Sequence, residues 1–182
     1  TFAVDDDNTA YIGIADMATG FPEYSLLAID SSGNEKWRVP FEDTCYNRTA
    51  VSMHEDSLFL INCYGLIQVN KHTKERIILD NHSPSSMAHG NTLAISSNGD
   101  VYYITGSTTL KVFRSDGAYP FITGMVLNDY PILDGNNNLI VASIEWSGGI
   151  SYVLTAFNSA GEILWENRDL DDIIVNLTIG SD

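Results

Sequence analysis

Basic residues are scarce in this chain: 9 Lys and Arg stand against 24 Asp and Glu, and the net charge is −15. The basic residues that are present form no cluster. Binding to nucleic acid requires cationic side chains that neutralise phosphates, so this composition argues against a nucleic-acid partner. It argues in the same way against an anionic membrane surface. A well-solvated acidic surface is the simplest interpretation of the negative charge.

Long hydrophobic runs are also missing. No apolar stretch approaches the ~20 residues that a membrane-spanning helix requires, and the N-terminal residues do not resemble a signal peptide. We therefore expect no direct insertion into a membrane. The chain begins at Thr1 within a strand-like pattern, from which we expect that a leader or a preceding domain has been removed.

No segment shows the sustained 3.6-residue periodicity of a helix. Segments such as SLLAID (25–30) and TLKVF (109–113) instead have a period of two and belong to regions rich in β-branched and aromatic residues. Clusters of Asp, Asn, Ser and Gly, which favour tight turns, separate these segments. The sequence therefore predicts an all-β fold.

What the sequence contains instead is a repeat. LLAIDSSGNEKW (26–37) and LTAFNSAGEILW (154–165) are nearly the same twelve residues. In each copy a Gly is preceded five residues earlier by Ala and followed four residues later by Trp. Weaker copies centre on Thr73 and Gly117. The corresponding Ala, Gly and Trp positions of the four copies are Ala28, Gly33 and Trp37; Gln68, Thr73 and Ile77; Val112, Gly117 and Phe121; and Ala156, Gly161 and Trp165.

Each repeat opens with a short apolar strand, a polar turn and a second strand. The four openings begin at Val4, Val51, Ile95 and Ile132, with spacings of 47, 44 and 37, and a fifth begins at Ile179. Four antiparallel strands at a period in the forties describe a β-propeller blade. We predict a β-propeller region with about four blades, at approximately 1–47, 48–91, 92–128 and 129–175, and the start of a fifth at 176–182.

The runs AIDSSGNEKW (28–37) and AFNSAGEILW (156–165) resemble the tryptophan-docking motif of the PQQ-like, quinoprotein alcohol dehydrogenase-like β-propeller repeats. The resemblance covers all four units. It implies that the residues of the motif stabilise the fold by packing and take no part in catalysis. It also implies a ring of seven or eight blades, so we expect this chain to be part of a longer propeller, or a half-ring that associates with itself through open blade edges. A small ring of four blades is the other alternative. The docking residues are Ala28, Gly33, Trp37, Ala156, Gly161 and Trp165.

Quinone-dependent enzymes of that family need PQQ, a bound Ca²⁺, a carboxylate base and a disulfide between adjacent cysteines. Cys45 and Cys63 are 18 positions apart, and no residue here matches the family's Ca²⁺ ligands or base. We therefore expect neither PQQ nor Ca²⁺ and assign no catalytic or metal-ligating residue. A fragment of a secreted or periplasmic enzyme, either quinone-dependent or carbohydrate-active, is the alternative.

The chain has only two cysteines. A hairpin that sets Ile61 opposite Val51 places Cys63 within reach of a loop that carries Cys45, so either a disulfide or two separate thiols fits the sequence. The spacing matches no zinc motif. The acidic runs at 5–7 and 134–138 are interpreted as solvated hairpin turns rather than Ca²⁺ sites.

Function is expected in the longer loops, because ligands of propellers usually meet the face where these loops gather. The segments 15–25, 40–49 and 143–151 combine aromatic and acidic residues, as recognition surfaces do. The alternative is that the aromatic rings only cap the ends of the blades. The candidate binding residues are Asp16, Phe21, Tyr24, Tyr46, Glu145 and Trp146.

Together these features predict a non-catalytic propeller that serves as a scaffold for binding a protein or a glycan. The expected location is the periplasm, the cell surface or the extracellular medium.

Overall fold

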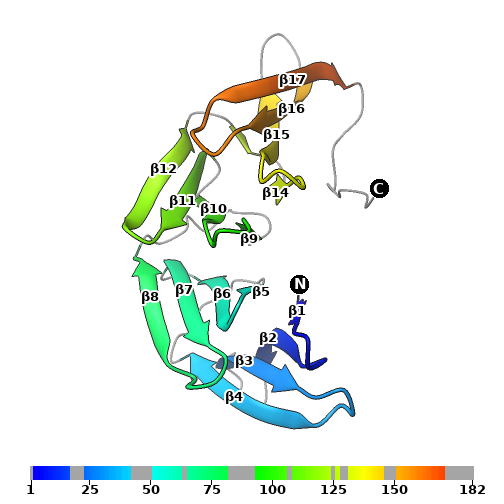
Figure 1. Cartoon of the computed structure of the whole chain (residues 1–182), viewed down its shortest axis with the longest axis vertical. Coiled ribbons are helices and arrows are strands. Elements are labelled where there is room, and N and C mark those ends of the chain that lie inside the picture. Colours follow the sequence, from blue (N-terminus) through cyan, green and yellow to red (C-terminus); the bar gives the residue numbers. More distant parts are fainter. Residues whose placement is uncertain are drawn as a thin grey trace. The chain divides into compact units, whose positions relative to one another are not determined.

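The computed structural model describes residues 2–16, 23–41, 51–62, 65–81, 93–105, 108–123, 126–127, 131–145 and 151–170. All regular elements within these ranges are β-strands, so the all-β prediction is confirmed. The chain divides into two compact units, Thr1–Ser83 and Pro84–Asp182. Each unit contains two antiparallel sheets (Figure 1).

The first unit contains two four-stranded sheets, each a simple meander in which consecutive strands pair. The first sheet consists of β1 (Phe2–Val4), β2 (Ala10–Asp16), β3 (Glu23–Ile29) and β4 (Glu35–Phe41). The second sheet consists of β5 (Val51–His54), β6 (Ser57–Asn62), β7 (Gly65–Asn70) and β8 (Arg76–Asp80).

The second unit repeats this arrangement. Its third sheet consists of β9 (Leu93–Ile95), β10 (Val101–Thr105), β11 (Thr109–Arg114) and β12 (Gly117–Thr123). The fourth sheet consists of β13 (Val126–Leu127), β14 (Ile132–Leu133), β15 (Leu139–Glu145), β16 (Ser151–Phe157) and β17 (Ile163–Leu170). Both β13 and β14 pair with β15, so together they form the first strand position of this sheet. The sequence spacing assigned 126–127 to the third unit of the repeat, whereas these residues pair within the fourth sheet.

The repeated twelve residues contain one and the same turn. Asp30 Oδ1 accepts hydrogen bonds from the backbone N–H groups of Ser32 and Asn34, at 2.9 and 2.8 Å. Asn158 Oδ1 accepts them from Ala160 and Glu162, at 3.0 and 2.9 Å. The fourth residue of each turn has a positive φ, 86° at Gly33 and 85° at Gly161, a conformation that glycine adopts without strain. The short polar side chain and the glycine therefore close this hairpin together.

The same turn closes the hairpins that open three of the four sheets. Asp5, Ser96 and Asp134 each accept a backbone hydrogen bond from the residue four positions ahead. The residue three positions ahead has a positive φ in every case, at Asn8, Gly99 and Asn137. The oxygens of Asp5 and Asp134 are thus used by their own turns, which agrees with the interpretation of 5–7 and 134–138 as hairpin turns.

The Ala and Trp of the repeat face one another across the outer strand pair. Ala28 lies opposite Trp37 between β3 and β4, and Ala156 lies opposite Trp165 between β16 and β17. Both alanines are buried, at 0% and 1% exposure. A methyl side chain leaves room for the large indole beside it, which explains why the two residues recur together.

Two registers differ from the sequence interpretation. In the third sheet Val112 lies opposite Tyr119 rather than Phe121, because a two-residue turn joins Arg114 to Gly117 and shifts the pairing. In the second sheet Val51 lies opposite Leu60 rather than Ile61. A two-residue turn at 55–56 pairs the strand ends directly and so fixes this register. Cys45 and Cys63 lie outside the described residues.

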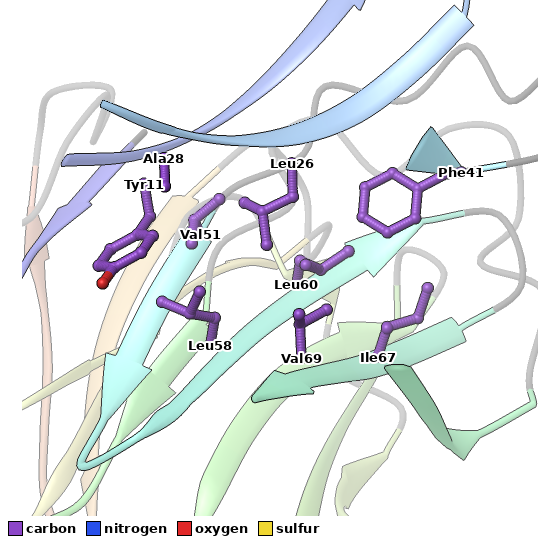
Figure 2. Packing of buried hydrophobic residues seen from close by; sticks show 9 residues of the cluster. All are labelled: Tyr11, Leu26, Ala28, Phe41, Val51, Leu58, Leu60, Ile67 and Val69. Carbon is purple, nitrogen blue, oxygen red and sulfur yellow. The ribbon is translucent and has the colours of Figure 1, made fainter. Parts of the chain in front are cut away.

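The core of the first unit lies between the first and second sheets (Figure 2). The face that the first sheet contributes is called the docking face, and the face that the second sheet contributes is called the receiving face. The docking residues are Tyr11, Leu26, Ala28 and Phe41, with the partly buried Trp37 and Val39 beside them. The receiving residues are Val51, Leu58, Leu60, Ile67 and Val69.

The core of the second unit is built in the same way between the third and fourth sheets. The docking face of the third sheet consists of Ala94, Tyr102, Leu110, Val112 and Ile122. The receiving face of the fourth sheet consists of Leu139, Val141 and Phe157. Phe121 packs edge-on against Tyr102 and Phe157, with ring centroids 5.2 and 6.2 Å away. It therefore packs between the two sheets although it is not the strand partner of Val112.

Candidate functional site

The strand connections leave each sheet at two opposite ends, because consecutive strands are antiparallel. The turn end carries the short connections between first and second and between third and fourth strands, such as 5–9 and 30–34. The loop end carries the connections between second and third strands, which follow Asp16 in the first sheet and Glu145 in the fourth.

At the turn end of the first unit, Asp5 is buried and fully engaged. Its Oδ1 accepts backbone hydrogen bonds from Asp7 and Thr9 at 3.0 and 2.9 Å, and its Oδ2 accepts one from the Tyr11 hydroxyl at 2.7 Å. Lys71 Nζ, from the second sheet, lies 3.9 Å from Asp5 and 3.3 Å from Asp56. Asp5 therefore closes a turn and helps to connect the two sheets.

Burial acts to raise the pKa of Asp5, but hydrogen bonds from Tyr11, Thr9 and Asp7 and the charge of Lys71 outweigh it, and the pKa lies below its ordinary value. Burial and the hydrogen bond to Asp5 raise the pKa of Tyr11. The carboxyl group thus stays ionised and the phenol stays protonated, which is the pairing that a structural hydrogen bond needs.

The turn end of the second unit is connected by side chains too. The backbone N–H of Ser97 donates to Asn137 Oδ1 at 2.9 Å, and Asn137 Nδ2 donates to Ser97 Oγ at 2.8 Å. Arg114 donates to the Asp100 carboxylate at 3.2 Å and to the backbone oxygen of Ser159 at 2.8 Å. In both units the polar groups of the turn end therefore hold neighbouring sheets together.

At the loop end of the first unit, Asp16 is the exposed last residue of β2 and lies opposite Glu23. Tyr24 follows, opposite Phe41 of β4, and is partly buried against the core. The Arg76 guanidinium carbon lies 5.9 Å from the centre of the Phe41 ring, within cation–π range. Tyr24 therefore packs against the core at this end of the sheet, while Asp16 is exposed at the end of β2.

At the loop end of the second unit, Glu145 is the last residue of β15 and lies opposite Ser151. Its Oε2 accepts a hydrogen bond from Arg168 Nη1 at 2.6 Å. Arg168 also donates to Glu166 Oε2 from its Nε and Nη2, at 3.3 and 3.2 Å. Glu145 is thus held in one orientation by an exposed ion pair.

The sequence-predicted binding residues fall into three groups. Asp16 and Tyr24 lie together at the loop end of the first sheet, and Glu145 lies at the loop end of the fourth sheet, in the other unit. Phe21, Tyr46 and Trp146 lie outside the described residues. The sequence analysis missed Arg168. Its alternation with Glu166 on one strand indicates an ion pair between these two residues. Its pairing with Glu145 across the sheet depends on the strand register and is not visible in the sequence.

Ser143 and Thr155 lie on the receiving face of the fourth sheet and are buried, at 1% and 0% exposure. Within the described residues their hydroxyls have no hydrogen-bond partner. An unpaired buried hydroxyl lowers stability.

The described ranges offer neither a metal-binding cluster nor a membrane-spanning helix. These ranges hold no group of three or more His, Cys, Asp or Glu that could bind a metal ion. Among the same residues, none belongs to a helix of the length and apolarity needed to cross a membrane.

Comparison with known proteins identifies the fold. No family model and no curated protein matches the chain. A member of the DUF4221 family from Bacteroides vulgatus is similar, with a TM-score of 0.52 and 10% identity over 79% of this chain. The extracellular domain of a putative one-component system from B. thetaiotaomicron is similar, with a TM-score of 0.55 and 11% identity over 90% of this chain.

At these identities the likeness concerns the fold alone. The four-stranded antiparallel sheets and the two similar structures confirm the prediction of β-propeller blades. The chain spans 60% of the first of these proteins and 27% of the second. A ring of seven or eight blades stays a prediction, as does the relation to PQQ-like repeats.

Proposed function

We propose that this chain is part of a non-catalytic, extracytoplasmic β-propeller that binds a protein or a glycan at the loop ends of its sheets. The observation that carries the proposal is the position of two carboxylates: Asp16 ends β2 and Glu145 ends β15, each at the start of a longer connection. Asp16 is exposed. Glu145 is oriented by Arg168, whose Nη1 donates to Glu145 Oε2 at 2.6 Å.

The chemistry of the loop end suits recognition. Carboxylates accept hydrogen bonds from sugar hydroxyls or from basic and amide groups of a protein. The loops that follow Asp16 and Glu145 carry Phe21 and Trp146. Rigid aromatic rings contribute contact area at low entropic cost, and loops on a rigid scaffold are common binding elements.

The proposed location draws on one similar structure, which is the extracellular domain of a putative one-component system. By analogy we place this chain in the periplasm, at the cell surface or in the extracellular medium. The chain spans only 27% of that protein. Any activity or partner of a longer protein that contains this chain is therefore a proposal as well. We expect no nucleic-acid partner.

A binding screen with a matched control tests the proposal. The chain is applied to an array of glycans and to a library of displayed peptides, and any ligand found is titrated against Asp16→Ala and Asp6→Ala. Both changes remove one exposed carboxylate, but Asp6 lies in a hairpin turn at the opposite end. We expect Asp16→Ala to weaken binding at least about tenfold and Asp6→Ala to change it less than about twofold. Equal effects of the two variants would place binding elsewhere.

The alternative is a fragment of a secreted or periplasmic enzyme, quinone-dependent or carbohydrate-active. A PQQ-dependent enzyme binds the quinone together with Ca²⁺, so its absorbance and melting temperature change on titration. We propose that neither changes here. A saturable shift with PQQ and Ca²⁺ would instead favour the quinone-dependent enzyme.

A further inference from the structure

Glu145, the last residue of β15, belongs to a group of three ion-paired side chains at the loop end of the fourth sheet. Arg168 Nη1 donates to Glu145 Oε2 at 2.6 Å. From the same guanidinium, Nε and Nη2 both donate to Glu166 Oε2, at 3.3 and 3.2 Å. Glu166 therefore holds the guanidinium, and the guanidinium holds the Glu145 carboxylate.

This group has hydrogen-bonding capacity left over. Among the side chains that the structure describes, Arg168 is the one donor to Glu145, and Oε1 of that carboxylate accepts from none of them. A guanidinium carries five N–H donors, and the three hydrogen bonds above leave two of them unused. The side chains of Arg168 and Glu145 are 52% and 37% exposed. A free acceptor and free donors thus lie side by side at the surface.

The charges of the group indicate which ligand it fits. A cationic group that approaches Glu145 is repelled by Arg168, and an anionic group that approaches Arg168 is repelled by Glu145 and Glu166. A neutral ligand avoids both repulsions. It must donate to the carboxylate and accept from the guanidinium at neighbouring atoms. Two adjacent hydroxyl groups of a sugar do this, because each hydroxyl both donates and accepts.

Polar side chains continue on the same face of the sheet. Ser143 precedes Glu145 by two residues on β15 and therefore shares its face, and Thr155 lies opposite Glu166. Both hydroxyls are buried and have no hydrogen-bond partner within the described residues. Apolar side chains would serve packing better at these two positions. The polar strip indicates that this end of the face is built for hydrogen bonding as well as for packing.

We propose that Glu145 and Arg168 bind an uncharged glycan through two adjacent hydroxyl groups of one sugar, with Glu166 as the positioning residue of Arg168. One hydroxyl donates to Glu145 Oε1, and its neighbour accepts a hydrogen bond from the Arg168 guanidinium. The assignment rests on the function proposed above, because it narrows the ligand from a protein or a glycan to an uncharged glycan at the fourth sheet.

The ligand class is tested with an array of neutral, uronic-acid-containing and amino-sugar oligosaccharides, and with displayed acidic and basic peptides. We expect binding to neutral oligosaccharides, and loss of binding when their hydroxyl groups are methylated, because a methyl ether cannot donate to Glu145. The affinity should stay constant as NaCl is raised, since the ligand carries no charge. Binding of a basic peptide through Glu145, weakened by salt, would overturn the glycan assignment but leave the function proposed above intact.

Titration of variants with the neutral oligosaccharide that binds most tightly tests the residues. Glu145→Ala and Arg168→Ala should each weaken binding at least about tenfold. Glu162→Ala is the matched control, because Glu162 is an exposed carboxylate that pairs with Asn158 at the turn end of the same hairpin. It should change the affinity less than about twofold. All three side chains are exposed, so the variants should keep the melting temperature of the unaltered chain.

The positioning role of Glu166 is tested by a double-mutant cycle. Glu166→Gln alone should weaken binding about threefold and should have no further effect on Arg168→Ala, because Glu166 acts through that guanidinium. An additive effect would overturn the positioning role. Glycan binding that is lost in Asp16→Ala but unchanged in Glu145→Ala would overturn the assignment to the fourth sheet and leave the function proposed above standing. Binding to no oligosaccharide and no peptide would overturn both.

Discussion

Trp37 lies directly opposite the buried Ala28 across β3 and β4, and its indole packs on Tyr11 with ring centroids 5.7 Å apart. The small residue provides the space that the large one fills. The same pair recurs as Ala156 and Trp165 in the fourth sheet. The repeated twelve residues therefore form the same hairpin, with the same Ala–Trp strand pair, in two blades.

The Trp37→Ala variant should lose a substantial part of the stability of the chain. The indole is partly buried on the core of the first unit, and its removal takes one packing partner away from Tyr11 and Ala28. We expect the free energy of unfolding to fall by about 2–3 kcal/mol, measured by urea denaturation. Ile77→Ala is the control, because Ile77 holds the same position opposite Gln68 but is 49% exposed. A similar loss for both variants would show that Trp37 contributes no special packing.

Three glycines test the role of backbone conformation in the turns. Gly33 and Gly161 have φ near +85°, at 86° and 85°, and an added Cβ meets nothing closer than 3.8 Å at either position. Alanine there should therefore cost only the backbone strain, about 1–2 kcal/mol. Gly135 has no positive φ and open space around it, so Gly135→Ala should be neutral or slightly stabilising. Thermal unfolding measures the stability of the three variants. A loss of stability for Gly135→Ala equal to that for Gly33→Ala would contradict this prediction.

Asp5 should be essential for the first turn. The Asp5→Ala variant leaves the N–H of the buried Thr9 and the Tyr11 hydroxyl without their acceptor. We expect a loss of about 2–3 kcal/mol in the free energy of unfolding. Asp6→Ala, which removes an exposed carboxylate one residue away, should stay within about 0.5 kcal/mol. Equal stability of the two variants would mean that the Asp5 hydrogen bonds contribute nothing net.

The stability of the chain should also fall in acid. The pKa of Asp5 in the fold lies below its ordinary value of 3.8, so the folded state binds this proton less tightly than the unfolded state. The resulting stabilisation is complete above the ordinary value and is lost as the pH falls through the lower, folded pKa. Chemical denaturation between neutral pH and strong acid should show this loss, and Asp5→Asn should reduce its steepness. An unchanged slope in that variant would assign the acid sensitivity to other carboxyls.

Replacing threonine by valine should have opposite effects on the free energy of unfolding at Thr155 and at Thr9. Thr155 is buried and its hydroxyl has no partner within the described residues, so Thr155→Val should be neutral or raise the free energy of unfolding by up to about 1 kcal/mol. Thr9 is buried too, but its hydroxyl accepts a hydrogen bond from Lys36 Nζ at 2.9 Å. Thr9→Val should therefore destabilise. Urea denaturation compares the two, and destabilisation by Thr155→Val would show that its hydroxyl has a partner.

The sequence was sufficient to predict the strand order and the turns, because both depend on local features. Asp30 and Gly33 mark a turn by their own chemistry, and alternation marks the strands around it. The Ala28–Trp37 pairing followed from a repeat that is visible without a structure. These features need no knowledge of distant residues.

Registers that depend on turn length were less predictable. Val112 pairs with Tyr119 because the turn before Gly117 contains only two residues, although the spacing from Gly117 to Phe121 matches that of the other copies. The ion pair between Glu145 and Arg168 joins residues far apart in sequence and needs the register of β15, β16 and β17. The binding roles of Asp16, Tyr24 and Glu145 stay predictions, as do those of Phe21, Tyr46 and Trp146, which lie outside the described residues.

The claim that each unit is held together by a docking face packed on a receiving face is tested most directly by removing one buried side chain from that contact. Leu58 of the receiving face is fully buried in the cluster between the first and second sheets. We predict that Leu58→Ala lowers the free energy of unfolding, measured by urea denaturation, by about 2–4 kcal/mol. A fall of less than about 0.5 kcal/mol would contradict the claim.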